Sequence, residues 1–324
     1  MDANWIAIAA SIVLQSSPLI IAVCGETLSE RAGVVNLSLD GSLLLSAMAG
    51  FAAAYVSNSL LLGFLAGAGV GALMALVVAF GSLALRQSQV AVGFVLTLLG
   101  DSLSAFLGQN FTRLPGIWVP RLPIPWLKDI PVLGPIVFNQ DLVVYFALAL
   151  TLASTWWIFH SRPGLALRSA GERPEAAFAR GVAVRKLRYA YAVLGGALVG
   201  VAGAAYSLDV KIGWAEGHTR GLGWIALAIV IFGGWSPLRG ALGVLLFVAT
   251  RSVISVVLQR SLGESSVVVL NALPWLLMLL VLLVVSGRLG GQLLARLPAP
   301  LQRPLRGLMQ AAPPAALGAE LKEG

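Results

Sequence analysis

Charged residues are scarce in this sequence, and their scarcity excludes a soluble globular domain. Only 11% of the 324 residues are charged, whereas 58% are hydrophobic and the mean hydropathy is +0.88. A soluble domain carries about 25% charged residues, because polar groups have to cover its surface. We therefore expect most of this chain to face lipid or other helices.

Cysteine, histidine and nucleotide-binding motifs are also rare or absent. Cys24 is the only cysteine, which excludes a disulfide framework, and it is expected to be a small buried residue. His160 and His218 stand far apart, so the sequence predicts no metal site and no His-based catalysis, and we expect His218 in a solvated loop. No lysine is followed by Ser or Thr, so the phosphate-binding sequence GxxxxGK[ST] does not occur. We predict no catalytic residue and no cofactor on this chain; any ATP that drives it binds to a partner.

Long uncharged stretches are what the sequence has in abundance. They occupy residues 3–25, 41–85, 142–159, 189–208, 221–238 and 265–287. About 20 apolar residues cross the hydrocarbon core of a bilayer, and a polar break at 55–59 divides the second stretch into two spans. With further segments at 87–108 and 238–258, the sequence predicts an all-α polytopic membrane protein of about nine helices, within a range of roughly eight to ten. No basic region precedes the first stretch, so we interpret it as a retained span and not as a signal peptide.

The basic residues predict the domain organisation and the orientation. Residues 160–188 and 287–324 together hold 12 of the 22 Lys and Arg residues. Cytoplasmic segments carry an excess of basic residues, so both regions are expected in the cytoplasm. We predict a transmembrane domain at 1–286, with a cytoplasmic loop at 160–188 and an external Pro-rich loop at 110–140. A flexible cytoplasmic tail is expected at 287–324.

Two segments interrupt the apolar pattern. Residues 25–41 read GETLSERAGVVNLSLDG, which places polar and charged side chains between two apolar runs. Residues 213–240 have an apolar centre, 224–232, that is too short to cross a membrane. Interruptions of this kind in two halves of a chain indicate broken helices from an internal repeat, which line a central path.

Individual side chains in these segments allow more than one role. Arg31 can pair with Glu26 across the break or with the adjacent Glu30 at an interface. Asp40 can cap the helix that follows it or face a transported molecule. The rings of Phe94 and Trp224 can stack on a flat ligand or act as ordinary packing and interfacial groups.

A short capped helix is predicted in the cytoplasmic loop, where residues 171–181 read GERPEAAFARG. Pro174 suits the first turn of a helix, and Gly181 suits the position just after its end. Ala176, Ala177 and Phe178 give this helix an apolar face. Such a face favours docking to a soluble partner, and the alternative is a surface helix resting on lipid headgroups.

The chain resembles the permease subunits of bacterial ABC importers of the sugar and branched-chain amino acid type. The resemblance is greatest to the nucleoside and purine branch, which works with a basic-membrane-protein-like lipoprotein. It covers residues 20–285. It is carried by GETLSERAGVVNLSLDG at 25–41, GERPEAAFARGV at 171–182 and GLGWIALAIVIFGGWSPLRGALGVLLF at 221–247.

The resemblance implies a type II importer permease fold in the bacterial inner membrane. It implies three partners, namely a second, homologous permease, a cytoplasmic ATPase that hydrolyses ATP, and an external solute-binding lipoprotein. The function implied is ATP-driven import of a nucleoside or related small polar solute. The coupling helix that seats in the ATPase would comprise Gly171, Glu172, Pro174, Glu175, Ala176, Ala177, Phe178 and Gly181. The candidates along the translocation path are Asn36, Ser38, Asp40, Phe94, Trp224 and Phe232.

Two other functions stay open on the residues alone. An ion-gradient-driven secondary transporter would need a coupling-ion site, for which Asp40 or Asp101 could serve. An intramembrane enzyme would need a catalytic constellation, and the sequence places none at a usable spacing. Among imported solutes, a simple sugar is the alternative to a nucleoside.

Overall fold

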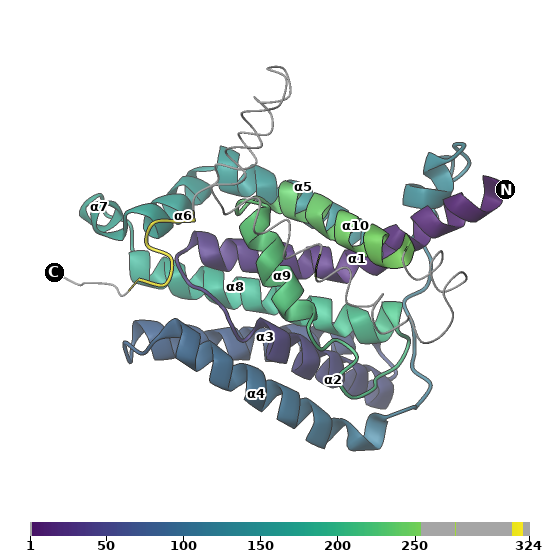
Figure 1. Ribbon diagram of the computed structural model, residues 1–324, viewed down its shortest axis with the longest axis horizontal. Helices are drawn as coiled ribbons and strands as arrows, with labels where there is room; N and C mark the ends of the chain where they lie inside the picture. The colour runs from purple at the N-terminus through teal and green to yellow at the C-terminus, as the bar shows by residue number, and fades with distance from the viewer. Residues whose placement is uncertain (1, 254–275, 277–312, 320–324) are drawn as a thin grey trace.

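Helices make up the regular structure of the described residues. The computed structural model describes residues 2–253, 276 and 313–319, and within them no strand forms apart from two isolated bridges. Figure 1 shows the helices as one bundle. The α-helices are α1 (Asp2–Arg31), α2 (Leu39–Ser57), α3 (Leu60–Leu83), α4 (Gln89–Gly108), α5 (Leu142–His160), α6 (Arg162–Glu172), α7 (Pro174–Ala179), α8 (Val184–Ala205), α9 (Leu222–Phe232) and α10 (Pro237–Val253). The short helical turns are η1 (Gln109–Phe111), η2 (Gly134–Phe138) and η3 (Tyr206–Val210).

Six helices in the described part of the chain are long and apolar enough to cross a membrane. They are α1, α2, α3, α4 extended by η1, α5, and α8 extended by η3. The predicted break at 55–59 is confirmed, because α2 ends at Ser57 and α3 begins at Leu60. Helix α9 has 11 residues and is too short to span alone, as its sequence predicted. The polytopic helical class is confirmed. The count of about nine is not, and the predicted segment 265–286 lies outside the described residues, apart from Leu276.

Helix α8 lies at the centre of the bundle and packs on α1, α2 and α3 (Figure 1). Glycines allow its backbone to approach theirs. A Cβ atom on Gly71 of α3 would lie 2.2 Å from the carbonyl oxygen of Gly196, and one on Gly200 would lie 2.0 Å from that of Gly67. Apolar lipid supplies no hydrophobic drive for helices to associate, so close packing between small residues holds such bundles together.

The α3–α8 contact gives a prediction with a control on the same helix. Gly71→Ala would push a methyl group into the α8 backbone, whereas Gly69→Ala meets open space, with nothing within 4 Å. We expect Gly71→Ala to lower the stability of the detergent-solubilised protein by about 1–3 kcal/mol, the usual cost of overpacking. Gly69→Ala should leave it unchanged or slightly raised, because Ala favours helix over Gly. Thermal unfolding of the two variants measures the difference, and equal midpoints would contradict the assignment of this contact.

The first predicted interruption is shorter than the sequence suggested. Helix α1 continues through Gly25 to Arg31, and the break is confined to residues 32–38. Gly25 does not interrupt the helix because it serves packing: a Cβ there would lie 2.6 Å from the carbonyl oxygen of Gly195 on α8. A glycine inside an apolar helix thus marks close approach of a neighbour and not a broken backbone.

Candidate functional site

The break between α1 and α2, residues 32–38, is an irregular segment that lies within the sequence motif at 25–41. Helix α1 ends in a glycine cap, in which Gly33 has φ +90° and its N–H donates to the Glu30 carbonyl at 2.9 Å. Only glycine adopts this left-handed conformation without strain, so the RAGV sequence ends the helix there. The chain then runs through the interior until Leu39 begins α2.

Side chains from two helices bind the backbone of this break. The Val35 N–H donates to Gln89 Oε1 at 2.8 Å, and the Asn36 N–H donates to Glu26 Oε1 at 3.0 Å. The Thr97 hydroxyl donates to the Leu37 carbonyl at 2.8 Å. Irregular backbone at membrane depth is tolerated only where protein or a watery cavity satisfies it. Here α1 and α4 provide those partners.

The predicted path residues Asn36 and Ser38 lie in this break and are fully buried. The Ser38 hydroxyl donates to Asn36 Oδ1 at 2.6 Å and lies 3.1 Å from the Ser42 hydroxyl. The Asn36 Nδ2 and the Glu26 Oε2 are buried without a hydrogen-bond partner. A donor in the break and an acceptor in the neighbouring turn of α1 therefore have no hydrogen-bond partner inside the bundle.

Asp40 caps a helix, but not the one that the sequence suggested. Its carboxylate accepts the N–H of Gly221 at 2.8 Å and the N–H of Gly223 at 2.9 Å, which belong to the start of α9. The first N–H groups of a helix lack internal partners and carry partial positive charge, so a carboxylate stabilises them. A Cβ on Gly223 would lie 2.3 Å from the Asp40 Cα, so the two helix starts touch through their backbones. The expectation that Asp40 caps the helix that follows it is corrected: it caps α9, which is far away in the sequence.

The three aromatic candidates are not all brought together. The rings of Phe94 and Trp224 are neighbours, with centroids 6.5 Å apart and planes tilted by 50°. Phe232 lies at the other end of α9, about 12 Å along the helix axis from Trp224 at 1.5 Å per residue. There its ring packs against Gly243 of α10. Phe94 and Trp224 thus form one aromatic group beside the start of α9, and Phe232 is separate from it.

The turn between α9 and α10 is fastened to the end of α1. The indole N–H of Trp235 donates to Glu30 Oε2, and the Arg31 Nε donates to the Trp235 carbonyl at 2.8 Å. Trp235 is buried and has φ +52°, and the two contacts hold this unusual conformation. Of the two pairings that the sequence allowed for Arg31, the one with Glu26 does not form: Glu26 binds the Asn36 backbone, while Arg31 binds the carbonyls of residues 234 and 235.

Arg31 also contacts the loop at 160–188. Its guanidinium lies 5.5 Å from the centroid of the Phe159 ring at the end of α5, and Arg168 of the loop contacts the same ring at 5.7 Å. Gly171, near the end of α6, packs on the end of α1, where a Cβ would lie 2.2 Å from the Arg31 carbonyl oxygen. The end of α1 is therefore where the α9–α10 turn and the 160–188 loop meet.

The short capped helix predicted after Gly171 is present as α7. It runs from Pro174 to Ala179, and Gly181 follows with φ +84° in the expected cap position. Ala177 is buried, whereas the Phe178 side chain is 72% exposed. Gly171 and Glu172 belong instead to α6, which begins where the Ser161 hydroxyl accepts the Gly164 N–H at 3.0 Å. Helix α7 is thus a short helix that buries Ala177 and exposes the aromatic ring of Phe178.

Charged groups beside the start of α9 are paired. Arg220 and Asp101 form a 2.9 Å salt bridge, and this carboxylate raises the pKa of Arg220 above its ordinary value. His218 lies in the turn before α9, so the expected loop position is confirmed, but its side chain is half-buried there, 3.3 Å from the Ser207 hydroxyl. Burial lowers the pKa of His218, because it disfavours the charged imidazole.

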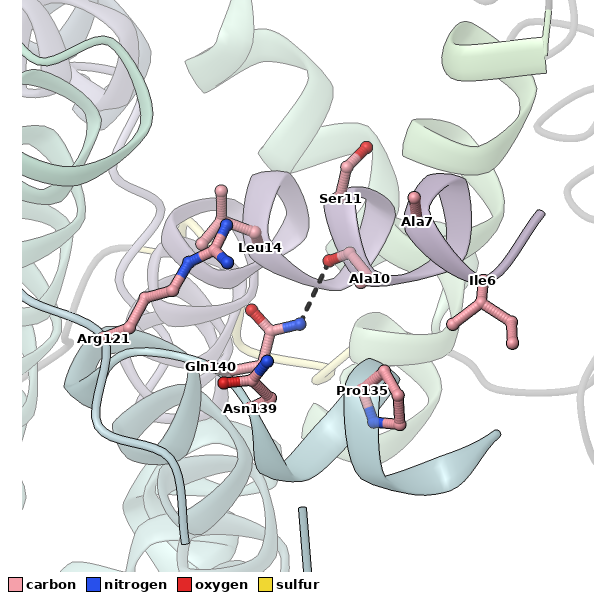
Figure 2. Close-up of a pocket in the computed structure, with 9 residues that line it drawn as sticks. All are labelled: Ile6, Ala7, Ala10, Ser11, Leu14, Arg121, Pro135, Asn139 and Gln140. Carbon is pink, nitrogen blue, oxygen red and sulfur yellow. Dashed lines mark hydrogen bonds between the residues drawn. The ribbon is translucent and has the colours of Figure 1, made fainter. Parts of the chain in front are cut away.

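A pocket of about 310 Å³ lies between the first half of α1 and the Pro-rich loop (Figure 2). Polar groups from Ser11, Arg121, Asn139 and Gln140 line it, and the Gln140 amide donates to the Ala10 carbonyl at 3.1 Å. None of the predicted path residues lines it. It belongs to the attachment of the Pro-rich loop to α1.

Sequence reasoning missed three polar residues that build the site. Gln89 and Thr97 bind the backbone of the 32–38 break, and Arg188 lies fully buried at the start of α8. Thr97 is a polar residue within an apolar helix, a weak signal of hydrogen bonding between helices, and Gln89 gave no such signal because it follows the polar residues 86–88 at the start of α4. Nothing in the sequence indicated that Arg188 is buried, because it is one of seven basic residues in the 160–188 region.

Comparison with known proteins places the chain among permeases. Residues 8–286 match the family described as branched-chain amino acid transport system / permease component. TsgC13 from Haloferax volcanii, which carries a provisional name as a glucose ABC transporter permease protein, is 37% identical over 72% of this chain and 73% of its own. The nucleoside ABC transporter permease protein NupC of Lactococcus lactis is 34% identical over 74% of this chain and 79% of its own. The guanosine ABC transporter permease protein NupQ of Bacillus subtilis is 33% identical over 76% and 80%. No solved structure matches the chain.

The family match covers most of the chain, and it agrees with a bundle whose described part contains six helices long and apolar enough to cross a membrane. The relatives named above are permeases that match over more than two thirds of their own lengths. The chain therefore belongs to the branched-chain amino acid transport system permease component family, and it is a multi-pass membrane protein and the permease component of an ABC transporter.

Proposed function

We propose that this chain forms half of the translocation path of an ATP-driven importer and couples that path to a separate ATPase subunit. The observation that carries the proposal is α7, a two-turn helix that exposes Phe178 while its base is fixed to the end of α1. An exposed aromatic ring on a rigid turn suits insertion into a partner's groove. The coupling residues would be those predicted at 171–181, with Phe178 as the anchor.

The solute path is proposed beside the two broken segments. Residues 32–38 interrupt α1 and α2, and the short helix α9 starts at the Asp40 carboxylate. Discontinuous helices near the middle of a bundle are where transporters bind their solutes. The unpartnered Asn36 Nδ2 and the Phe94–Trp224 ring pair supply a donor and an aromatic surface for a small polar solute with a flat ring. The type II importer fold and the internal repeat belong to this proposal.

The proposed assembly follows from the ABC permease family. It consists of this chain, a homologous second permease, a cytoplasmic ATPase that hydrolyses ATP, and a solute-binding lipoprotein outside the bacterial inner membrane. This chain supplies no chemistry to the solute and binds no cofactor. ATP binding would favour one access state through contacts that differ between the states.

A nucleoside is the proposed solute, with a simple sugar as the alternative. NupC is named for nucleosides and NupQ for guanosine, whereas TsgC13 is named for glucose. The Phe94–Trp224 pair favours a solute with a flat ring over a sugar. An ion-gradient-driven transporter is less well supported, because Asp40 already caps α9 and Asp101 already pairs with Arg220.

Uptake into proteoliposomes that hold the complete assembly tests the proposal. We expect labelled guanosine to enter only when ATP is available to the ATPase, and an ionophore should not stop it. Unlabelled guanosine should compete with the label, and glucose should not. Uptake that needs no ATP and collapses with the ionophore would show a secondary transporter in place of an ATP-driven importer. Competition by glucose and not by guanosine would show that the solute is a sugar.

A further inference from the structure

Residues 313–319 fold back onto the end of the bundle beside α6 and α8, where Figure 1 shows them in yellow. They belong to the segment for which the sequence predicts a flexible tail. Two turns form within them: the Leu317 N–H donates to the Pro314 carbonyl at 2.9 Å, and the Ala319 N–H donates to the Ala316 carbonyl at 3.2 Å. Pro314 and Ala316 are buried. We call residues 313–319 the C-terminal strap.

The strap is hydrogen-bonded to the elements that support α7. The Ala316 N–H donates to the Gly171 carbonyl at 2.9 Å, and the Ala315 N–H donates to Glu172 Oε2 at 3.2 Å. The Gly318 N–H donates to the Gly33 carbonyl at 3.3 Å. The strap thus joins the end of α6 to the end of α1.

The buried guanidinium of Arg188 is oriented toward the strap. Its Nη1 donates to the Ala319 carbonyl at 3.4 Å, and its Nη2 lies 3.5 Å from the Ala316 carbonyl and 3.3 Å from that of Ala170. The side chain is 0% exposed. A buried charge without partners is costly, so strap carbonyls that receive it are structurally important to this end of the bundle.

Helix α7 and the strap lie next to each other on one end of the molecule. Glu172, which binds the strap, precedes the first residue of α7 by two positions. Ala176 and Phe178 on α7 are exposed, and Ala315 on the strap is exposed as well. Figure 1 shows both elements at the same end of the bundle.

We propose that the C-terminal strap and α7 form one composite surface on which the ATPase subunit docks, and that the strap holds the α6–α7 junction in position for it. The inference rests on the proposed function. The exposed residues Arg173 and Arg180 flank α7. The partner surface that fits therefore has an apolar groove for Phe178 with acidic groups at its rim, and it extends over the strap.

Single-cysteine crosslinking in the assembled complex tests the composite surface. The native Cys24 is buried, so an introduced cysteine would be the reactive thiol of the described residues. Ala176→Cys probes α7, Ala315→Cys probes the strap, and Lys128→Cys on the exposed Pro-rich loop is the control. With a short thiol-to-amine crosslinker, we expect products with the ATPase from Ala176→Cys and Ala315→Cys and none from Lys128→Cys.

The outcomes distinguish the composite surface from the proposed coupling role of α7. Crosslinking from Ala176→Cys alone would overturn the composite surface and leave the coupling role of α7 intact. Crosslinking from neither position, in a complex that still contains the ATPase, would overturn the proposed coupling role of α7 and the inference together.

A charge placed beneath the strap tests its positioning role. Ala316→Lys puts a cation beside the buried Arg188, whereas Ser57→Lys adds the same charge at the exposed end of α2. In the Ala176→Cys background, we expect Ala316→Lys to lower the crosslink yield by about tenfold, because the strap has to leave its seat to keep the charge in water. Ser57→Lys should leave the yield unchanged at an equal membrane level. An unchanged yield with Ala316→Lys would overturn the positioning role.

Discussion

Replacing Phe178 with Asp is expected to abolish ATP-driven uptake while the protein still inserts and folds. The Phe178 side chain is 72% exposed, so its loss should change stability by no more than about 0.5 kcal/mol. If the ring is the anchor of the ATPase contact, its removal should weaken association by about 30-fold, because truncating such an anchor costs about 2 kcal/mol or more. Co-purification of the ATPase and uptake by the complex measure the two effects.

Two matched variants separate the ring from the added charge. Phe178→Leu keeps an apolar group and should retain much of the uptake. Ala179→Asp places the same charge one position later on the exposed end of α7, where only a methyl group is lost, and should reduce uptake less than Phe178→Asp. Normal uptake and ATPase association in Phe178→Asp would show that α7 is not the coupling element.

The second large effect is expected at Asp40. Asp40→Leu removes the acceptor of the Gly221 and Gly223 N–H groups and leaves both donors without a partner at the start of α9. Each buried donor without a partner costs about 1–3 kcal/mol. We expect α9 to leave its position and uptake to fall by more than about tenfold, the ratio that corresponds to 1.4 kcal/mol. Uptake and thermal unfolding of the purified variant are the measurements.

A conservative replacement distinguishes capping from ion coupling. Asp40→Asn keeps the oxygen that accepts both N–H groups and removes only the charge, so it should retain more uptake than Asp40→Leu. Gly223→Ala should resemble Asp40→Leu, because its methyl group would lie 2.3 Å from the Asp40 Cα. If Asp40→Asn were as inactive as Asp40→Leu while Gly223→Ala transported normally, the charge itself would be required and the cap would not explain the residue.

The long helices could be predicted from the sequence because the signal for each is local. Uncharged stretches fixed the positions of α2, α3 and α5, and the polar residues near Asn58 separated α2 from α3. Helix α7 could be predicted equally well, because a proline at its start and a glycine after its end act within one or two turns. The break after α1 was placed too early, because Gly25 looks the same in sequence whether it interrupts a helix or admits a neighbouring backbone.

The contacts of the candidate site could not be predicted, because they join residues far apart in the chain. Capping was one of two roles that the sequence allowed for Asp40, but the group it caps lies 181 residues away at Gly221. In the same way, the indole of Trp235 binds Glu30 over a separation of 205 residues. Nothing local distinguishes a carboxylate that caps its own helix from one that caps another.

By itself, the sequence determined that this protein lies in lipid, where its long helices run and which family it resembles. The chain has too little charge to cover a soluble surface, which indicated that most of it faces lipid. The uncharged stretches predicted the membrane-spanning helices, and three motifs indicated the permease family. The tertiary structure alone decided which polar groups satisfy the backbone at the 32–38 break, where α9 begins against α2, and that the C-terminal strap lies beside α7. The physical reason is that hydropathy and capping act through near neighbours along the chain. The pairing of buried polar groups depends instead on which helices pack side by side, and that is set by contacts over the whole bundle.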